Sequence, residues 1–255
     1  MVNTLVLAPL IGLVVGLLMG SLGGGGGVLA VPVLVYVLDQ PVREATTISL
    51  VVVLFGAAVG LHALRGSGLV DWRTGLVFGG LGLGGSVLGS RLSYLVDPTY
   101  LLVGFSVLLV VVAVVMWRHA GRPEPAERTG EVSIAQLVPT AFGVGALTGF
   151  FGVGGGFATV PSLAVVMRMP AIIATSTSLV VIAVNATAAL VTRALGGGLS
   201  GIPWALVATF AVGTGLGTRL GGRVARKVRG VTLLRAFAVF LVVLGTVVAV
   251  ESLHR

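Results

Sequence analysis

Residues 20–32 read GSLGGGGGVLAVP, a run of five glycines between two strongly apolar segments. Residues 149–161 read GFFGVGGGFATVP, which is the same pattern displaced by 129 positions. Between residues 16 and 52, 18 of 37 positions are identical to their counterparts at that displacement. Chance does not give such agreement in a chain of this composition, so the sequence indicates an internal duplication and two related halves.

The composition is that of a membrane protein. Hydrophobic residues make up 56% of the 255 residues and charged residues 9%, with a mean hydropathy of +1.11. A soluble domain carries about 25% charged residues, so this chain cannot cover a water-facing surface. Uncharged runs of about 20 residues, enough for a helix to cross a bilayer, recur along the whole length. They argue against a soluble domain behind a signal peptide.

Each half is expected to contain a long first helix, a glycine break, a half-helix and three long helices. The segment 28–38 is only about 16 Å long at helical rise, half the thickness of a membrane. The predicted division is a first repeat at 1–117, a polar cytoplasmic linker at 118–131 and a second repeat at 132–255, in one membrane domain. The expected helices are 3–22, 28–38, 45–64, 72–92, 100–117, 133–151, 157–167, 172–191, 203–220 and 232–250.

Weaker similarities extend the duplication over each whole half. In the fourth helix, Gly85 and Gly89 match Gly213 and Gly217 at a displacement of 128. Glycines spaced by four, including these, are expected to form close-packing faces between helices.

The basic residues favour halves of opposite orientation. If each glycine-broken segment dips in and returns, or crosses twice, the halves are inverted and 12 of the 16 basic residues share one side. If the segment crosses once, the halves are parallel and the split is 9 against 7. The positive-inside rule therefore predicts inverted repeats in the cytoplasmic (inner) membrane, with both termini outside. Whether the broken segments are re-entrant or cross twice stays open.

The glycine breaks are candidate anion sites. Interrupted helices in inverted repeats are typical of transporters, which bind substrate near the midplane. Glycine leaves backbone N–H groups unshielded by side chains, and the half-helix adds the positive end of its dipole. Irregular backbone at this depth is tolerated only where it lines a cavity or is buried in protein. The predicted substrate ligands are the amides of Gly25, Gly26, Gly27, Gly154, Gly155 and Gly156.

Hydroxyl side chains repeat at matched positions after each half-helix. Residues three apart share a helix face, as Thr46 and Ser49 do, and as Thr175 and Ser178 do. These hydroxyls either donate to anionic oxygens or bond back to their own helix or a neighbouring one. The candidate substrate-binding side chains are Thr46, Thr47, Ser49, Thr175, Ser176 and Ser178, with Asn185 as either a ligand or an interhelical hydrogen-bonding group.

The charged residues are expected to lie outside the site. No Asp or Glu falls in the middle of a span, so no buried carboxylate relay is visible. Arg65 and Arg193 stand at helix ends and are interpreted as snorkelling anchors. The anion is therefore expected to be held by neutral donors.

The duplicated motif resembles that of the sulfite exporter TauE/SafE family. The pattern is G-x-x-G-x-G-G-G, then V-P, then P-x-x-x-A-T-x-x-S, present in both halves with Gly24 in one copy where Val153 stands in the other. The resemblance covers essentially the whole chain. It implies a carrier of sulfite, sulfonates such as sulfoacetate, or other sulfur-containing organic anions across the cytoplasmic membrane.

Together these features predict an all-α polytopic protein of two inverted repeats in the lipid bilayer. Its predicted function is a permease for small oxyanions, with sulfite or organosulfonates the leading substrates. An anion channel and an accessory membrane subunit are the alternatives. Without a nucleophile–base pair, zinc motif or phosphate loop, no enzyme activity, cofactor, metal or nucleic-acid partner is expected. The direction of transport, a coupling proton or ion, and a homo-oligomer stay open.

Overall fold

The computed structural model describes residues 2–93, 95–96, 98–121, 134–151, 156–195 and 201–253, which form helices and short connections without any strand. The elements of the first half are α1 (Val2–Leu22), η1 (Gly23–Leu29), α2 (Ala30–Tyr36), α3 (Val42–Ala63), α4 (Trp72–Ser93) and α5 (Pro98–Ala120). Those of the second are α6 (Ile134–Phe151), α7 (Gly156–Pro161), η2 (Ser162–Val166), α8 (Ala171–Leu195), α9 (Trp204–Lys227) and α10 (Gly230–Leu253).

Every predicted long helix is present, and most ends agree within a few residues. The exception is α9, which continues seven residues beyond the predicted end at residue 220. Gly221 and Gly222 do not end the helix, because Gly221 packs against the backbone of α1 at Leu17. Much of the predicted polar linker, including all of 122–131, lies outside the described residues.

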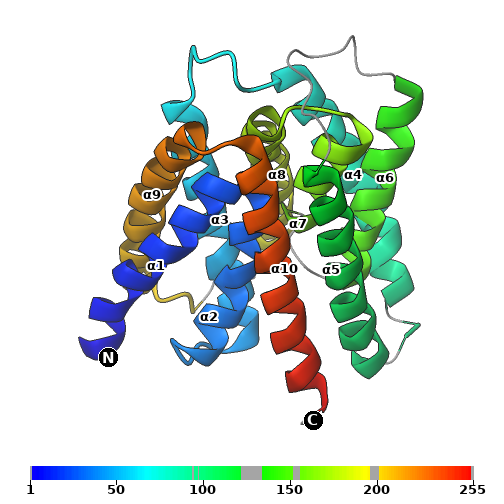
Figure 1. Cartoon of the computed structure of the whole chain (residues 1–255). Coiled ribbons are helices and arrows are strands. Elements are labelled where there is room, and N and C mark those ends of the chain that lie inside the picture. The colour runs from blue at the N-terminus through cyan, green and yellow to red at the C-terminus, as the bar shows by residue number, and fades with distance from the viewer. Residues whose placement is uncertain are drawn as a thin grey trace.

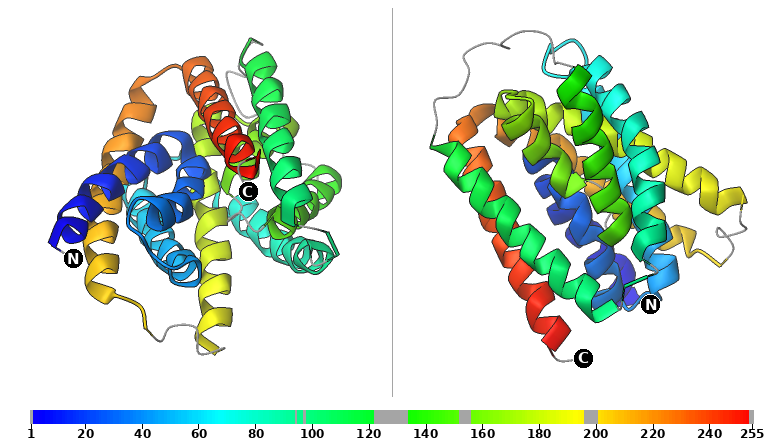
Figure 2. Two further views of the ribbon diagram at one scale, coloured as in Figure 1. Left: turned by 90° about the horizontal axis from the view of Figure 1, so that it is seen from below. Right: turned by 90° about the vertical axis from the view of Figure 1, so that its right-hand side faces the viewer.

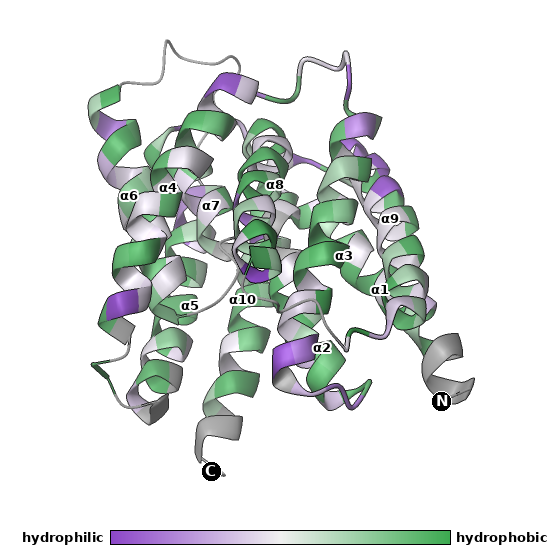
Figure 3. Ribbon diagram, turned by 180° about the vertical axis from the view of Figure 1, so that it is seen from behind, coloured by the Kyte–Doolittle hydropathy of each residue, from purple (hydrophilic) through white to green (hydrophobic). Residues whose placement is uncertain are grey.

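The lengths and surfaces of the helices are those of a polytopic membrane protein. Among the described residues, α3, α5, α6, α8 and α10 are long and apolar enough to cross a membrane. The predicted spans α4 and α9 are 22 and 24 residues long, about 33 and 36 Å, but are less apolar because they are rich in glycine. Large apolar side chains such as Val87, Val111 and Val243 are exposed. Hydrophobic residues line the sides of the helices (Figure 3), as contact with lipid requires.

The helices pack in pairs that exchange partners between the halves. The first helix of each half packs against the fourth helix of the other, so that α1 lies on α9 and α6 lies on α4. The remaining pairs, α3 with α8 and α5 with α10, join equivalent helices. The pairs α1–α9 and α4–α6 flank the central α3 and α8 on opposite sides (Figure 2).

Glycines bring these exchanged pairs into backbone contact, as the sequence predicts. A Cβ atom at Gly16 would lie 2.1 Å from the carbonyl oxygen of Thr214, and one at Gly145 would lie 2.0 Å from that of Gly82. The contact from Gly12 to Phe210 lies one turn before that from Gly16 to Thr214, so α1 and α9 run in the same direction.

These contacts correct the matching of the fourth helices. Gly16 and Gly145 are equivalent at the displacement of 129, and their partners Thr214 and Gly82 differ by 132. The correct displacement of α9 from α4 is therefore 132 rather than 128. The matching of Gly85 with Gly213 is wrong by one helical turn, and Gly85 corresponds to Gly217.

The turns after the two half-helices are alike in backbone detail. Asp39 and Arg168, at matched positions, have φ angles of 50° and 52°, which non-glycine residues seldom adopt. Just before them, the N–H of Leu38 donates to Val33 O at 3.1 Å, and the N–H of Met167 donates to Ser162 O at 3.1 Å. The duplication therefore extends to the conformation of these turns.

The two ends of the bundle differ in charge. The start of α1 and the end of α10 lie at one end, whereas α5 ends and α6 begins at the other (Figure 1). We call the latter the basic end. The described basic residues on the segments that end or begin there are Arg65, Arg73, Arg118, Arg168, Arg219, Arg223, Arg226, Lys227, Arg229 and Arg235, and those on segments that end or begin at the opposite end are Arg43, Arg91 and Arg193.

Candidate functional site

The first glycine run is a tight helical segment rather than an irregular break. Residues Gly23–Leu29 form a 3₁₀ helix, in which each N–H donates to the carbonyl three residues earlier. Most of its amides therefore bond within the segment, unlike the free amides expected at Gly25, Gly26 and Gly27. In the second run, Gly154 and Gly155 lie outside the described residues, and Gly156 begins α7.

The 3₁₀ segment packs directly on the hydroxyl-bearing helix of the other half. Gly23 has a φ of 71°, and a Cβ atom there would lie 2.5 Å from Ser178 Oγ and 2.9 Å from the carbonyl oxygen of Thr175. Element η1 also contacts α7, the start of the other half-helix. The structure thus brings a predicted glycine break and two predicted hydroxyl residues together, and we call Gly23, Thr175 and Ser178 the Gly23 cluster.

The predicted hydroxyls bond back to their own helices, which is the alternative that the sequence left open. Thr175 Oγ1 donates to Ala171 O at 2.7 Å, and Ser178 Oγ donates to Thr175 O at 2.7 Å. Thr46 and Ser49 make equivalent bonds at 2.9 Å to Arg43 O and Thr46 O, and Ser176 is buried in the same turn as Thr175. A hydroxyl must therefore rotate away from its own backbone before it donates to an anion.

A basic residue that the sequence placed outside the site contacts the second group of hydroxyls. Arg193, near the end of α8, donates from Nη1 to Thr46 Oγ1 at 2.9 Å and to Thr47 Oγ1 at 2.5 Å. Its interpretation as a snorkelling anchor is wrong, because the guanidinium ties α8 to the start of α3. We call Arg193, Thr46, Thr47 and Ser49 the Arg193 cluster. The duplication gave no signal for it, since the matched residue in the first half is Leu64.

The predicted substrate ligands therefore form two clusters rather than one site. Helices α3 and α8 run in opposite directions, because Gly60 lies at Leu179 whereas Thr46 lies at Arg193. Thr175 precedes Arg193 by 18 residues, about 27 Å along α8. A small anion cannot touch both clusters at once.

Asn185 does not fit the role of an anion ligand through its carbonyl oxygen. Its Oδ1 is buried and accepts no hydrogen bond within the described part of the chain. An enclosed acceptor of this kind is satisfied by water or another donor. An anion brings no such donor, and among the described residues no interhelical hydrogen bond reaches Oδ1.

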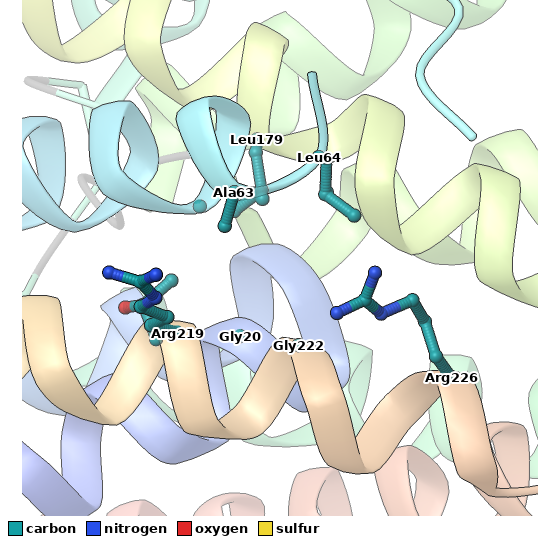
Figure 4. A pocket seen from close by; sticks show the side chains of 9 residues that line it. Gly20, Ala63, Leu64, Leu179, Arg219, Gly222 and Arg226 are labelled. Carbon is teal, nitrogen blue, oxygen red and sulfur yellow. The ribbon is translucent and has the colours of Figure 1, made fainter. Parts of the chain in front are cut away.

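A small pocket lies between α1, the end of α3, α8 and the last turns of α9 (Figure 4). Its volume is about 20 Å³, room for one water molecule. Two of its residues border the Gly23 cluster in sequence, since Leu179 follows Ser178 and Gly20 lies three residues before Gly23. The sequence did not single out its two arginines. The lining residues are Gly20, Gly60, Ala63, Leu64, Leu179, Thr218, Arg219, Gly222 and Arg226.

Comparison with known proteins agrees with this architecture. The family described as Sulfite exporter TauE/SafE matches residues 8–248. A probable membrane transporter protein of Xylella fastidiosa (strain 9a5c) is 36% identical over 216 residues, which cover 82% of each chain. The probable membrane transporter protein YunE of Bacillus subtilis (strain 168) is 26% identical over 97% of this chain and 98% of its own. No solved structure matches the chain significantly.

The family match spans both glycine runs, both hydroxyl groups and all ten α-helices apart from their outermost ends. The described part of the same chain includes five helices that are long and apolar enough to cross a bilayer. The chain therefore belongs to the sulfite exporter TauE/SafE family of membrane transporters.

Proposed function

We propose that the chain moves small oxyanions, with sulfite or organosulfonates as the leading substrates, through the interface between its two halves. The observation that carries the proposal is the contact of Gly23 in one half with Thr175 and Ser178 in the other. Transporters built from repeats place their substrate sites at such interfaces, on interrupted helices. The description of the family, which names sulfite, supports this substrate class.

Inverted repeats in one membrane domain are part of the same proposal. Three observations support them: equivalent helices pair as α3 with α8 and α5 with α10, the turns at Asp39 and Arg168 match, and each half runs from one end of the bundle to the other. The excess of described basic residues at the basic end supports a cytoplasmic position for that end. Both termini would then face outward.

The two clusters suit consecutive positions of one anion on its path. The Gly23 cluster lies nearer the basic end, and the Arg193 cluster lies toward the opposite end, so the anion occupies one after the other. At the second position the Arg193 guanidinium supplies a positive charge beside the hydroxyls of Thr46 and Thr47. Charge-assisted hydrogen bonds to an oxyanion are about twice as strong as neutral ones. The proposed site therefore adds an arginine to the neutral donors that the sequence analysis expected.

Flux into proteoliposomes tests the proposal. The purified protein is reconstituted, and uptake of labelled sulfite, sulfoacetate and sulfate is measured against empty vesicles. We expect saturable uptake of at least one sulfur oxyanion, accelerated by the same anion on the opposite side, because a carrier returns faster when loaded. Saturation without such acceleration would indicate a channel. The absence of uptake for all three anions would contradict the substrate class.

A further inference from the structure

We infer that the pocket at the basic end is a capture subsite for one oxygen of an anionic headgroup, bound by Arg219 and Arg226. The inference rests on the proposed function and adds the residues by which the anion first binds. It concerns side chains that lie outside both the Gly23 cluster and the Arg193 cluster.

The geometry of α9 directs both arginines to the pocket. Arg219, Gly222 and Arg226 are spaced by three and four residues and so share one face of the helix. Figure 4 shows their guanidinium groups on either side of Gly222, facing Ala63 and Leu64 at the end of α3. Within the described part of the chain, neither guanidinium forms a hydrogen bond or ion pair. Two positive charges thus face one pocket, and no described acidic residue pairs with either of them.

The remaining walls strengthen the attraction and limit the size of the ligand. Leu64 and Leu179 are buried and apolar, so they keep water from one side of the pocket. Charges interact more strongly where water is excluded. The volume of about 20 Å³ admits one oxygen atom rather than a whole anion. A sulfite or sulfonate group fits this arrangement with one oxygen inside and the others against the guanidinium groups.

The subsite occurs at one end of the bundle only. At the displacement of 132, the matched residues of Arg219 and Arg226 are Val87 and Tyr94, which carry no positive charge. The arginine toward the opposite end, Arg193, is already hydrogen-bonded to Thr46 and Thr47. We therefore expect the protein to bind its anion more tightly from the basic end than from the other end.

The test compares Arg219→Gln, Arg226→Gln and the double variant with Arg223→Gln. Arg223 lies on the same helix and is exposed, but it does not line the pocket, so its substitution controls for the loss of one charge. Sulfite binding is measured by calorimetry on the purified protein, and the KM of sulfite flux is measured in phosphatidylcholine vesicles. For each single variant we expect both constants to rise roughly three- to tenfold, which is less than the loss of a buried hydrogen bond to a charged group would give, because both arginines are exposed and screened by water.

The outcomes separate this inference from the proposed function. Binding that weakens in the pocket variants but not in Arg223→Gln supports the subsite, even if the wild type shows no flux. Wild-type flux with the same constants in all variants overturns the subsite and leaves the proposed function standing. Since a phospholipid phosphate offers the same chemistry, the assays are repeated with phosphatidylglycerol. If the pocket variants lose activity relative to the wild type only in the phosphatidylglycerol vesicles, the pocket binds a lipid headgroup and the inference is overturned.

A conservative variant serves as the control for misfolding. Arg226→Lys keeps the charge and loses the planar fork of donors, so it should retain most of the binding that Arg226→Gln loses. Each variant must elute as a single species of wild-type size. If Arg226→Lys and Arg226→Gln bind equally weakly, the loss does not come from charge, and the inference is wrong.

Discussion

Replacing Gly23 by alanine tests the contact on which the proposed site depends. The added methyl group would lie 2.5 Å from Ser178 Oγ, whereas an ordinary contact begins at 3.4 Å. The Ser178 hydroxyl can rotate away, but the backbone oxygen of Thr175 lies 2.9 Å from the added methyl group, so α8 or Gly23 must move by about 0.5 Å. Either displacement loosens the contact between the first glycine run and the hydroxyls of the opposite half.

The loss in free energy of unfolding caused by Gly23→Ala has two parts that can be measured separately. An alanine at the φ of 71° costs roughly 1–2 kcal/mol in backbone strain. Overpacking in a well-filled interior costs about 1–3 kcal/mol. Gly23→Ala is therefore expected to destabilise the folded protein by about 2–5 kcal/mol and to reduce sulfite flux.

Gly66→Ala isolates the strain from the crowding. Gly66 has a φ of 74°, and a Cβ atom added there would have no other atom within 4 Å, so only the backbone cost applies. Ser178→Ala, combined with Gly23→Ala, removes the closest clashing atom and should restore part of the loss. Thermal unfolding in detergent and sulfite flux are measured for the wild type, Gly23→Ala, Gly66→Ala and the double variant. If Gly23→Ala matches Gly66→Ala in both measurements, the added methyl group does not clash with α8 and the reasoning fails.

Three further predictions address the orientation, the packing and the second cluster. A cysteine at Glu127 should react with a membrane-impermeant reagent only from the cytoplasmic side; labelling of intact cells from outside would reverse the orientation. Gly16→Ala should lower the unfolding temperature, because its Cβ would lie 2.1 Å from a backbone oxygen of α9, whereas Gly143→Ala, in open space on α6, should leave it unchanged or raise it. Arg193→Gln should reduce sulfite flux and lower the unfolding temperature by a few degrees through loss of its bonds to α3, whereas the exposed Arg91→Gln at the same end should do neither; equal effects of the two would count against the cluster.

The sequence predicts the helices well because their signal is local. Apolar runs of membrane-spanning length place α3, α5, α8 and α10 within a few residues of their observed ends. The glycine run is also visible, but its conformation is not. Five glycines are compatible with many backbone paths, and packing against α7 and α8 selects the 3₁₀ form at Gly23–Leu29.

The parts that could not be predicted depend on contacts between distant residues. Glycines repeat every four residues in α4 and α9, so Gly85 matches both Gly213 and Gly217, and only the contacts with α1 and α6 choose between them. The division of the hydroxyls into two clusters follows from the antiparallel pairing of α3 with α8. Arg193 reaches Thr46 for the same reason, although 147 residues separate them.

The exchange of partners between α1–α9 and α6–α4 has an evolutionary consequence. Neither half contains both members of either glycine-lined pair, so a half-length ancestor could bury these faces only against a second copy of itself. Such an ancestor would have been an obligate dimer. If the halves are inverted as we propose, its two subunits entered the membrane in opposite senses, and fusion of the two genes would have fixed that arrangement in one chain. The present protein should then tolerate a cut between its halves, with activity returning when the two fragments are expressed together and absent when either is expressed alone.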